Sequence, residues 1–143
     1  MPSGDFIVPI GKANVRRKGK DLSIITWGAM LYVADEAAEE LAKDGASVEI
    51  VDLRSILPFD EEAILESVAK TNRAIILHEA PLTGGAGAEF AARIAEKAFD
   101  YLDAPVKRIG ALDVPMPYSP PLEAFAMPNK DKVIAAAREL LAY

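Results

Sequence analysis

The 143-residue sequence has no cysteine, a single histidine and a single tryptophan. Without cysteine the chain has no disulfide, no catalytic thiolate and no cysteine metal site, and one histidine is too few for a zinc centre. No apolar run approaches the roughly 20 residues of a membrane-spanning helix, so we predict no membrane partner. Residues 1–5 have no basic start and no apolar stretch, which predicts that no signal peptide is present.

The charge balance is acidic, with a formal net charge of −6. An acidic surface repels phosphate backbones, so we predict no nucleic-acid partner. The hydrophobic and charged fractions, 51% and 27%, are those of a globular protein, and 143 residues fit one domain. We interpret the basic cluster at residues 12–20 as a solvated turn within an irregular lead-in that spans residues 1–20.

Short apolar runs alternate with amphipathic segments along the rest of the chain. The runs predict strands at residues 22–26, 47–53, 74–77 and 106–109. The amphipathic segments predict helices at residues 31–43, 61–70, 87–102 and 130–142. This alternation predicts a three-layer α/β fold, with a mostly parallel sheet of about five strands and helices on both faces.

Local signals place several boundaries of these elements. Gly45 can adopt the left-handed conformation that ends a helix, and Asp60 and Asn129 are typical N-caps. Five prolines fall between residues 115 and 128. Because proline lacks an amide proton and locks φ, we predict neither a helix nor a central strand in that stretch.

A glycine-rich turn at residues 83–87 joins the predicted third strand to the next helix. Gly84, Gly85 and Gly87 leave backbone amides bare at a helix N-terminus, where an anion can bind. The dinucleotide fingerprint, however, needs a third glycine where Phe90 stands, and no Walker A lysine follows. We therefore interpret the turn as a packing or interface turn. A stand-alone anion- or nucleotide-binding module is the alternative.

His78 ends the predicted third strand, at the edge of the sheet where ligands gather in parallel α/β folds. The adjacent Glu79 could tune the imidazole, but neighbouring residues on a strand point to opposite faces. We therefore assign no catalytic residue, no cofactor-binding residue and no metal ligand to this chain. His78 and Glu79 are the candidates for a catalytic role, and a structural or interface histidine is the favoured interpretation.

Five segments resemble, in order, the transketolase-type C-terminal domain of the beta subunit of thiamine-diphosphate-dependent 2-oxoacid dehydrogenases. They are residues 9–21, the Asp-Leu-Arg segment 51–58, the His-Glu-Ala-Pro and glycine segment 78–89, the Leu-Asp-Ala-Pro segment 102–108, and Pro-Met-Pro-Tyr at 115–118. Each segment is short, but together they run over nearly the whole chain. The sequence is identified as one domain of this family, residues 1–143.

The resemblance implies a place in a larger oxidoreductase. In this family the beta subunit pairs with an alpha subunit, usually as a heterotetramer, and together they bind thiamine diphosphate and magnesium. The enzyme decarboxylates pyruvate or a branched-chain 2-oxoacid and passes the acyl group to a lipoyl arm. We accordingly expect a cytoplasmic location, or the mitochondrial matrix in a eukaryote.

The sequence departs from the whole beta subunit in lacking a counterpart of the N-terminal, pyrimidine-binding domain and any Gly-Asp-Gly motif. We therefore expect an excised domain or split subunit that binds no cofactor alone and serves in assembly and docking. By resemblance, Asp103 and the terminal carboxylate of Tyr143 would contact the subunit-binding domain of the acyltransferase core. A homodimer is also expected, because loss of the neighbouring domain exposes apolar surface. The further alternative is a fragment that becomes active once its partners are added in trans.

Overall fold

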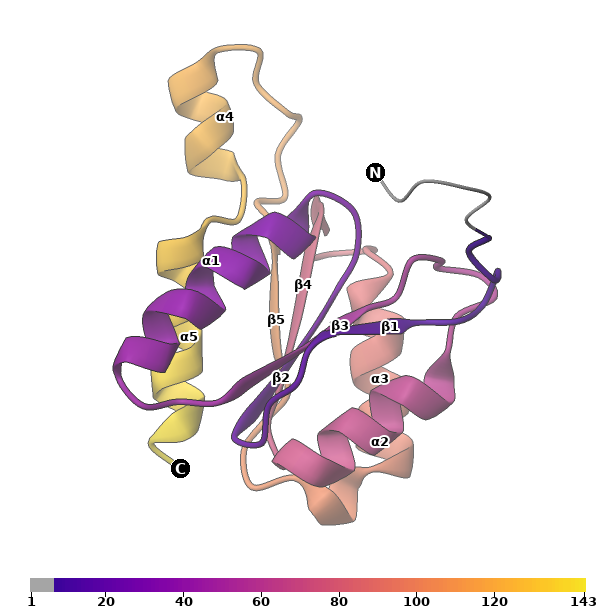
Figure 1. The fold of residues 1–143 in the computed structure, drawn as a ribbon. Coiled ribbons are helices and arrows are strands. Elements are labelled where there is room, and N and C mark those ends of the chain that lie inside the picture. The colour runs from indigo at the N-terminus through magenta and orange to yellow at the C-terminus, as the bar shows by residue number, and fades with distance from the viewer. Residues whose placement is uncertain (1–6) are drawn as a thin grey trace.

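The computed structural model describes residues 7–143 and forms a five-stranded sheet in the order β1-β3-β2-β4-β5 (Figure 1). The strands are β1 (Asn14–Arg17), β2 (Leu22–Thr26), β3 (Val48–Asp52), β4 (Ala74–Pro81) and β5 (Lys107–Ala111). The helices are α1 (Met30–Lys43), α2 (Glu61–Thr71), α3 (Gly87–Lys97), the 3₁₀ turn η1 (Phe99–Tyr101), α4 (Pro120–Ala126) and α5 (Lys130–Leu141).

The sheet is mostly parallel, as the sequence predicts. β2 pairs in parallel with both β3 and β4, and β4 pairs in parallel with β5. Only the edge strand β1 runs antiparallel, alongside β3. Because β3 and β4 lie on opposite sides of β2, the chain reverses its direction of winding between β2 and β4. That reversal makes the carboxyl ends of these two strands a topological switch point.

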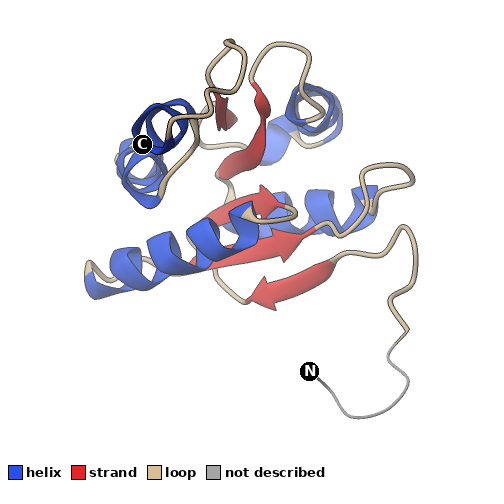
Figure 2. Cartoon of the chain, turned by 90° about the horizontal axis from the view of Figure 1, so that it is seen from above, coloured by secondary structure: helices blue, strands red, loops and turns tan. Residues whose placement is uncertain are grey.

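Helices cover both faces of the sheet, which gives three layers (Figures 1 and 2). On one face, α1 and α5 bury side chains such as Leu41 and Val133 against Ile24 and Ile75. The opposite face holds a second core, which α2 and α3 form with alternate residues of the same strands. No helix of the described residues is long and apolar enough to cross a bilayer.

The predicted boundary signals act as expected. The Asp60 carboxylate accepts a hydrogen bond from the Ala63 amide at 3.4 Å, and the Asn129 side chain accepts one from the Lys132 amide at 3.0 Å. Both bonds satisfy amides that have no partner inside their helices. Gly45 follows α1 with φ of +88°, a conformation that costs glycine little.

The structure differs from the predictions in the lead-in. β1 lies within residues 1–20, which we expected to be irregular, and Asn14 pairs with Asp52. Its sequence is basic, with Val15 as the only apolar residue, so it carries no strand-like pattern. An edge strand tolerates this composition because one side meets solvent, and its charges discourage pairing with other chains.

The structure also contains one helix that was not predicted, and two predicted element ends were wrong. α4 lies in the proline-rich stretch, because Pro120 and Pro121 occupy its first positions, where a helix needs no amide donor. β4 continues to Pro81 rather than ending at residue 77. The helix expected to reach residue 102 ends at Lys97, and η1 follows.

A buried hydroxyl and carboxylate network joins the sheet to α2. The Ser67 hydroxyl donates to the buried carboxylate of Glu49 at 2.6 Å and lies 2.6 Å from the Ser23 hydroxyl. Ser23 in turn lies 2.7 Å from the Thr71 hydroxyl. Lys70 pairs with the second oxygen of Glu49. The network therefore satisfies polar groups on β2, β3 and α2 together.

We predict that Ser67→Ala lowers the free energy of unfolding by about 1–3 kcal/mol, because it leaves buried partners unsatisfied. Urea denaturation measures this difference. Ser119→Ala is the matched control: Ser119 is exposed and its side chain caps no amide, so its loss should change stability by less than about 0.5 kcal/mol. Equal effects of the two substitutions would contradict the importance of the network.

Candidate functional site

The switch point between β2 and β4 is filled by two aromatic rings. Trp27 directly follows β2, and its indole stacks on the His78 imidazole with ring centroids 5.4 Å apart and planes 12° apart. At the same level, the Thr26 hydroxyl donates to the Leu77 carbonyl at 2.9 Å. The place where such folds hold a ligand is therefore occupied by the chain's own side chains.

The stack continues into the core of the α2 and α3 face. The Trp27 ring meets the Phe90 ring edge-on at 5.3 Å, and Phe90 meets Phe59 at 4.9 Å. Such edge-to-face pairs are favourable beyond their buried area. A row of four rings thus connects the loop after β2 to α3 and to the segment before α2.

Glycines surround the buried ring of His78. A Cβ added at Gly87 would lie 2.4 Å from Nε2, and one added at Gly85 or Gly110 would lie 2.8 or 2.9 Å from Cε1. A side chain at Gly87 would displace the imidazole. One at Gly85 or Gly110 would first meet a backbone carbonyl oxygen, that of Pro81 at 2.4 Å or that of Ala80 at 2.7 Å. Close packing against His78 therefore accounts for Gly85 and Gly87, whereas Gly84 has open space around it and adopts a φ of +76° that suits glycine.

His78 is inaccessible to solvent, with 0% exposure, and neither ring nitrogen has a side-chain hydrogen-bond partner among residues 7–143. Burial is the main cause that lowers the pKa of His78 below its ordinary value. The Ala80 backbone opposes this effect, and the positive charge of Arg108 adds a smaller lowering. Burial therefore favours the neutral form of the imidazole. A buried ring with no open approach is poorly suited to proton transfer with a substrate.

Glu79 does not join His78. It is exposed at the surface while His78 is buried, because the two side chains leave the strand on opposite faces. Its carboxylate lies near Gly28, at 3.4 Å from the position that a Cβ there would occupy. The two candidate catalytic residues therefore form no acid–base pair in this fold.

A carboxylate from another segment, that of Asp113, contacts the glycine-rich turn. Asp113, after β5, accepts hydrogen bonds from the Thr83 amide at 3.1 Å and the Thr83 hydroxyl at 2.6 Å. These donors, together with Arg108, lower the pKa of Asp113. Glu89 adds a second negative charge in the first turn of α3. Glu89 is paired with Arg93 at 2.7 Å, so the stronger argument against anion binding at this turn is that Asp113 already occupies the Thr83 donors.

We predict that His78 makes stability fall on mild acidification. The unfolded chain binds a proton near pH 6.5, whereas the folded chain binds it only at lower pH. The contribution of neutral His78 is therefore fully present above about pH 6.5 and is lost progressively as pH falls toward the folded-state pKa. Denaturation midpoints between pH 5 and 7.5 measure the slope. His78→Phe keeps a ring on Trp27 but cannot titrate, so an unchanged slope in this variant would refute the assignment.

The second candidate region lies at the opposite end of the sheet, around Asp103. The Asp103 side chain is 56% exposed, and its carboxylate lies 3.5 Å from the Arg73 guanidinium, which is 19% exposed. The Asp103 amide donates to the Asn72 carbonyl at 2.9 Å. The loop before β5 is thereby tied to the residues that enter β4.

The same guanidinium reaches the end of α5. Arg73 Nε donates to the Leu140 carbonyl at 3.0 Å, and the Tyr143 amide donates to that carbonyl at 3.3 Å. Tyr143 itself is 68% exposed. Asp103 and Tyr143, which are far apart in the sequence, are thus connected through Arg73 and Leu140. We call Asp103, Tyr143 and the connecting Arg73 the amino-edge surface.

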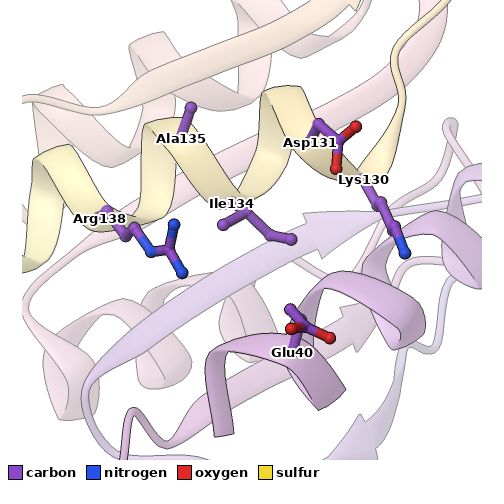
Figure 3. Close-up of a pocket in the computed structure, with 6 residues that line it drawn as sticks. All are labelled: Glu40, Lys130, Asp131, Ile134, Ala135 and Arg138. Atoms are coloured by element: carbon purple, nitrogen blue, oxygen red, sulfur yellow. The ribbon is translucent and has the colours of Figure 1, made fainter. Parts of the chain in front are cut away.

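A surface hollow of about 370 Å³ lies between α1 and α5 (Figure 3). Glu40, Lys130, Asp131 and Arg138 give it charges of both signs, and Ile134 lines it from α5. Arg138 also pairs with Asp44 at 2.7 Å. The charges of the hollow therefore offset one another, and its lining does not select a ligand of one charge.

Apolar side chains gather on a projecting segment, residues 112–126, which we call the arm. α4 stands away from the sheet in Figure 1, beyond the end of β5. Hydrogen bonds hold its base, including that from the Leu112 amide to the Ala126 carbonyl at 3.0 Å. The exposed apolar residues of the arm are Leu112, Val114, Met116, Tyr118, Leu122 and Phe125. Such a patch is typical of a protein–protein contact.

Residues 11–133 match the family model described as "Transketolase, C-terminal domain". The chain belongs to this family. A solved structure described as a split-gene transketolase, an inactive beta4 tetramer, superposes with a TM-score of 0.83 at 29% identity, over 96% of this chain and 44% of that one. The 2-oxoglutarate:ferredoxin oxidoreductase from Magnetococcus marinus, with a TM-score of 0.59 at 15% identity over 91% of this chain and 19% of that one, shows likeness of fold alone.

Curated relatives of this transketolase C-terminal domain are dehydrogenase beta subunits. The chain is 46% identical to the 2-oxoisovalerate dehydrogenase subunit beta of Bacillus subtilis, over 98% of this chain and 43% of the relative. It is 42% identical to the mitochondrial subunit beta 2 of Arabidopsis thaliana, over 100% and 39%. It is 43% identical to the pyruvate dehydrogenase E1 component subunit beta of Staphylococcus aureus, over 100% and 44%. The chain thus spans about two fifths of these relatives.

Several residues that define the two regions were not predicted from the sequence of this domain. Trp27 and Gly110 come from segments far from His78 in the chain, and Arg73 is likewise far from Asp103. The single tryptophan directly after a β-branched strand was the one available signal. The others follow from strand order, because residues at the ends of neighbouring strands meet only once the order is known.

Proposed function

We propose that this chain is an assembly and docking domain of the beta subunit of a 2-oxoacid dehydrogenase, and that it does not catalyse alone. The observation that carries the proposal is 42–46% identity, over 98–100% of the chain, to beta subunits of 2-oxoisovalerate and pyruvate dehydrogenases. Within the complete enzyme the domain would support oxidative decarboxylation and acyl transfer to lipoyl groups. The domain would be located in the cytoplasm of a bacterium or in the mitochondrial matrix of a eukaryote.

The geometry of the switch point supports a non-catalytic role for the isolated domain. Thiamine diphosphate carries two phosphates and a magnesium ion in this enzyme class. The described residues do not fit that group, because Trp27 and His78 fill the crevice and Asp113 occupies the donors of Thr83. The cofactor would therefore be held by the alpha subunit and the N-terminal part of the beta subunit.

The amino-edge surface supports the docking part of the proposal. Asp103 and the chain end at Tyr143 are both exposed and lie in one hydrogen-bonded neighbourhood. An exposed carboxylate attracts a basic partner and can pair with it through charge-assisted hydrogen bonds. The partner that we propose is the basic subunit-binding domain of the acyltransferase core.

We predict that Asp103→Ala weakens binding of an acyltransferase subunit-binding domain by about tenfold or more, equivalent to about 1.4 kcal/mol. Isothermal calorimetry at fixed salt measures the affinity. Asp100→Ala is the matched control, because Asp100 carries the same charge three residues earlier in η1 and forms no ion pair among the described residues. Equal weakening by both variants would indicate only general attraction. No binding by the unmodified chain would leave assembly as its role.

The arm supports the assembly part of the proposal. Its exposed apolar side chains are suited to burial against another subunit. The split-gene transketolase that shares this fold is described as a beta4 tetramer. In the complete enzyme the arm would contact the alpha subunit or a second beta subunit, and in isolation it would contact a second copy of this chain.

We predict that the isolated chain self-associates and that Phe125→Ser raises its dissociation constant at least about tenfold, since aromatic residues are typical hot spots of interfaces. Analytical ultracentrifugation over a range of concentrations measures the change. Tyr32→Ser on α1 is the control, because Tyr32 is 71% exposed, close to the 70% of Phe125, but lies outside the arm. A monomer at all concentrations, or an equal loss in the control, would argue against the arm as the contact.

A further inference from the structure

We propose that Arg73 is a positioning residue that couples Asp103 to the C-terminal turn, so that a basic partner meets the two as one preformed surface. The docking part rests on the proposed function, whereas the coupling between Asp103 and the C-terminal turn is a property of the chain alone. The partner's guanidinium or ammonium group would pair with Asp103, and Arg73 would hold the carboxylate in place.

The contacts of Arg73 make this assignment specific. Its NH1 group lies 3.5 Å from Asp103 Oδ2, and its Nε donates to the Leu140 carbonyl at 3.0 Å. One planar guanidinium can therefore engage the loop before β5 and the end of α5 at the same time. A lysine ammonium is a single point donor and lacks this fixed fork.

The backbone of Arg73 is itself held firmly. Its carbonyl accepts a hydrogen bond from the Ser23 amide at 2.9 Å and another from the Thr71 hydroxyl at 3.1 Å. The side chain then leaves a fixed point at the entrance to β4. Because only 19% of that side chain is exposed, solvent screens its interactions less than those of a surface arginine.

The Leu140 carbonyl links Arg73 to Tyr143. It lies in the last turn of α5, where a carbonyl has no further helical amide to accept from. It instead accepts from Arg73 Nε and, at 3.3 Å, from the Tyr143 amide. Arg73 also places a positive charge at a helix C-terminus, where the helix dipole favours it. Loss of the guanidinium should therefore loosen the turn that carries Tyr143.

Asp103 is suited to bind a second cation in addition to Arg73. Its carboxylate is 56% exposed, and Arg73 is 3.5 Å from one of its two oxygens. Its backbone is fixed through Asn72, whose carbonyl accepts from the Asp103 amide while its side-chain amide donates to the Tyr101 carbonyl at 2.6 Å. A carboxylate oriented before binding loses less conformational freedom when the partner arrives.

The first test measures binding of an acyltransferase subunit-binding domain to the full chain by calorimetry. We expect Arg73→Met to weaken binding about tenfold in the unmodified background and less than about threefold when Asp103 is already Asn, because the two residues act together. Arg73→Lys should not restore affinity. Lys107→Met is the control, since Lys107 pairs with Glu139 on α5 at 2.8 Å but has no ion pair with Asp103, and it should bind as the unmodified chain does.

The second test needs no partner. In the nuclear magnetic resonance spectrum, Asp103→Asn should shift the Tyr143 amide signal, and the shift should disappear when Arg73 is Met. A shift that persists in the Arg73→Met background overturns the coupling. If an Asp103 variant binds weakly but Arg73→Met binds as tightly as the unmodified chain, Arg73 has no role in docking. If the unmodified chain binds nothing, the docking function and its dependence on Arg73 fall together, and the amide signal still decides the coupling.

Discussion

The stack of His78 on Trp27 is the contact around which the carboxyl end of the sheet is arranged. It lies between the ends of β2 and β4, and it requires glycine at position 87, where an added Cβ would lie 2.4 Å from the imidazole. Any side chain at Gly87 would displace the imidazole, and Gly85 and Gly110 lie close to the same ring. The same packing explains why the histidine is buried and why its pKa is lowered.

Because aromatic side chains fill the switch point, the surfaces that we propose for assembly and docking lie elsewhere on the domain. Many parallel α/β proteins bind ligands at the carboxyl ends of their strands, but here that edge is aromatic and its turn is bordered by carboxylates. The exposed chemistry lies instead on the apolar arm beyond β5 and on the amino-edge surface near the end of α5. Those two surfaces lie at opposite ends of the molecule (Figure 1), so assembly and docking could proceed without competing for space.

The polar contacts of the domain differ in what they contribute. The Glu49, Ser67 and Ser23 network is buried and joins three elements, so its loss leaves unsatisfied groups in a medium of low polarity. Exposed pairs such as Lys43 with Glu40 lie in solvent and contribute little. The Arg73 contacts are intermediate: the guanidinium is mostly buried while its carboxylate partner remains open to solvent. This combination holds the Asp103 carboxylate in place and leaves it accessible to a partner.

The sequence by itself determined the fold class, the order of the elements, the caps at Asp60 and Asn129 and the membership of the family. These follow from apolar periodicity, from local hydrogen-bond geometry and from short motifs, all of which act over a few residues. It missed β1, whose basic edge strand has no apolar pattern, and α4, whose prolines stand where a helix tolerates them. Only the tertiary structure decided that Trp27 and Gly110 enclose His78 and that Arg73 connects Asp103 to the chain end. The physical reason is that such contacts depend on which strands become neighbours, and strand order is set by packing of the whole sheet rather than by any local stretch of sequence.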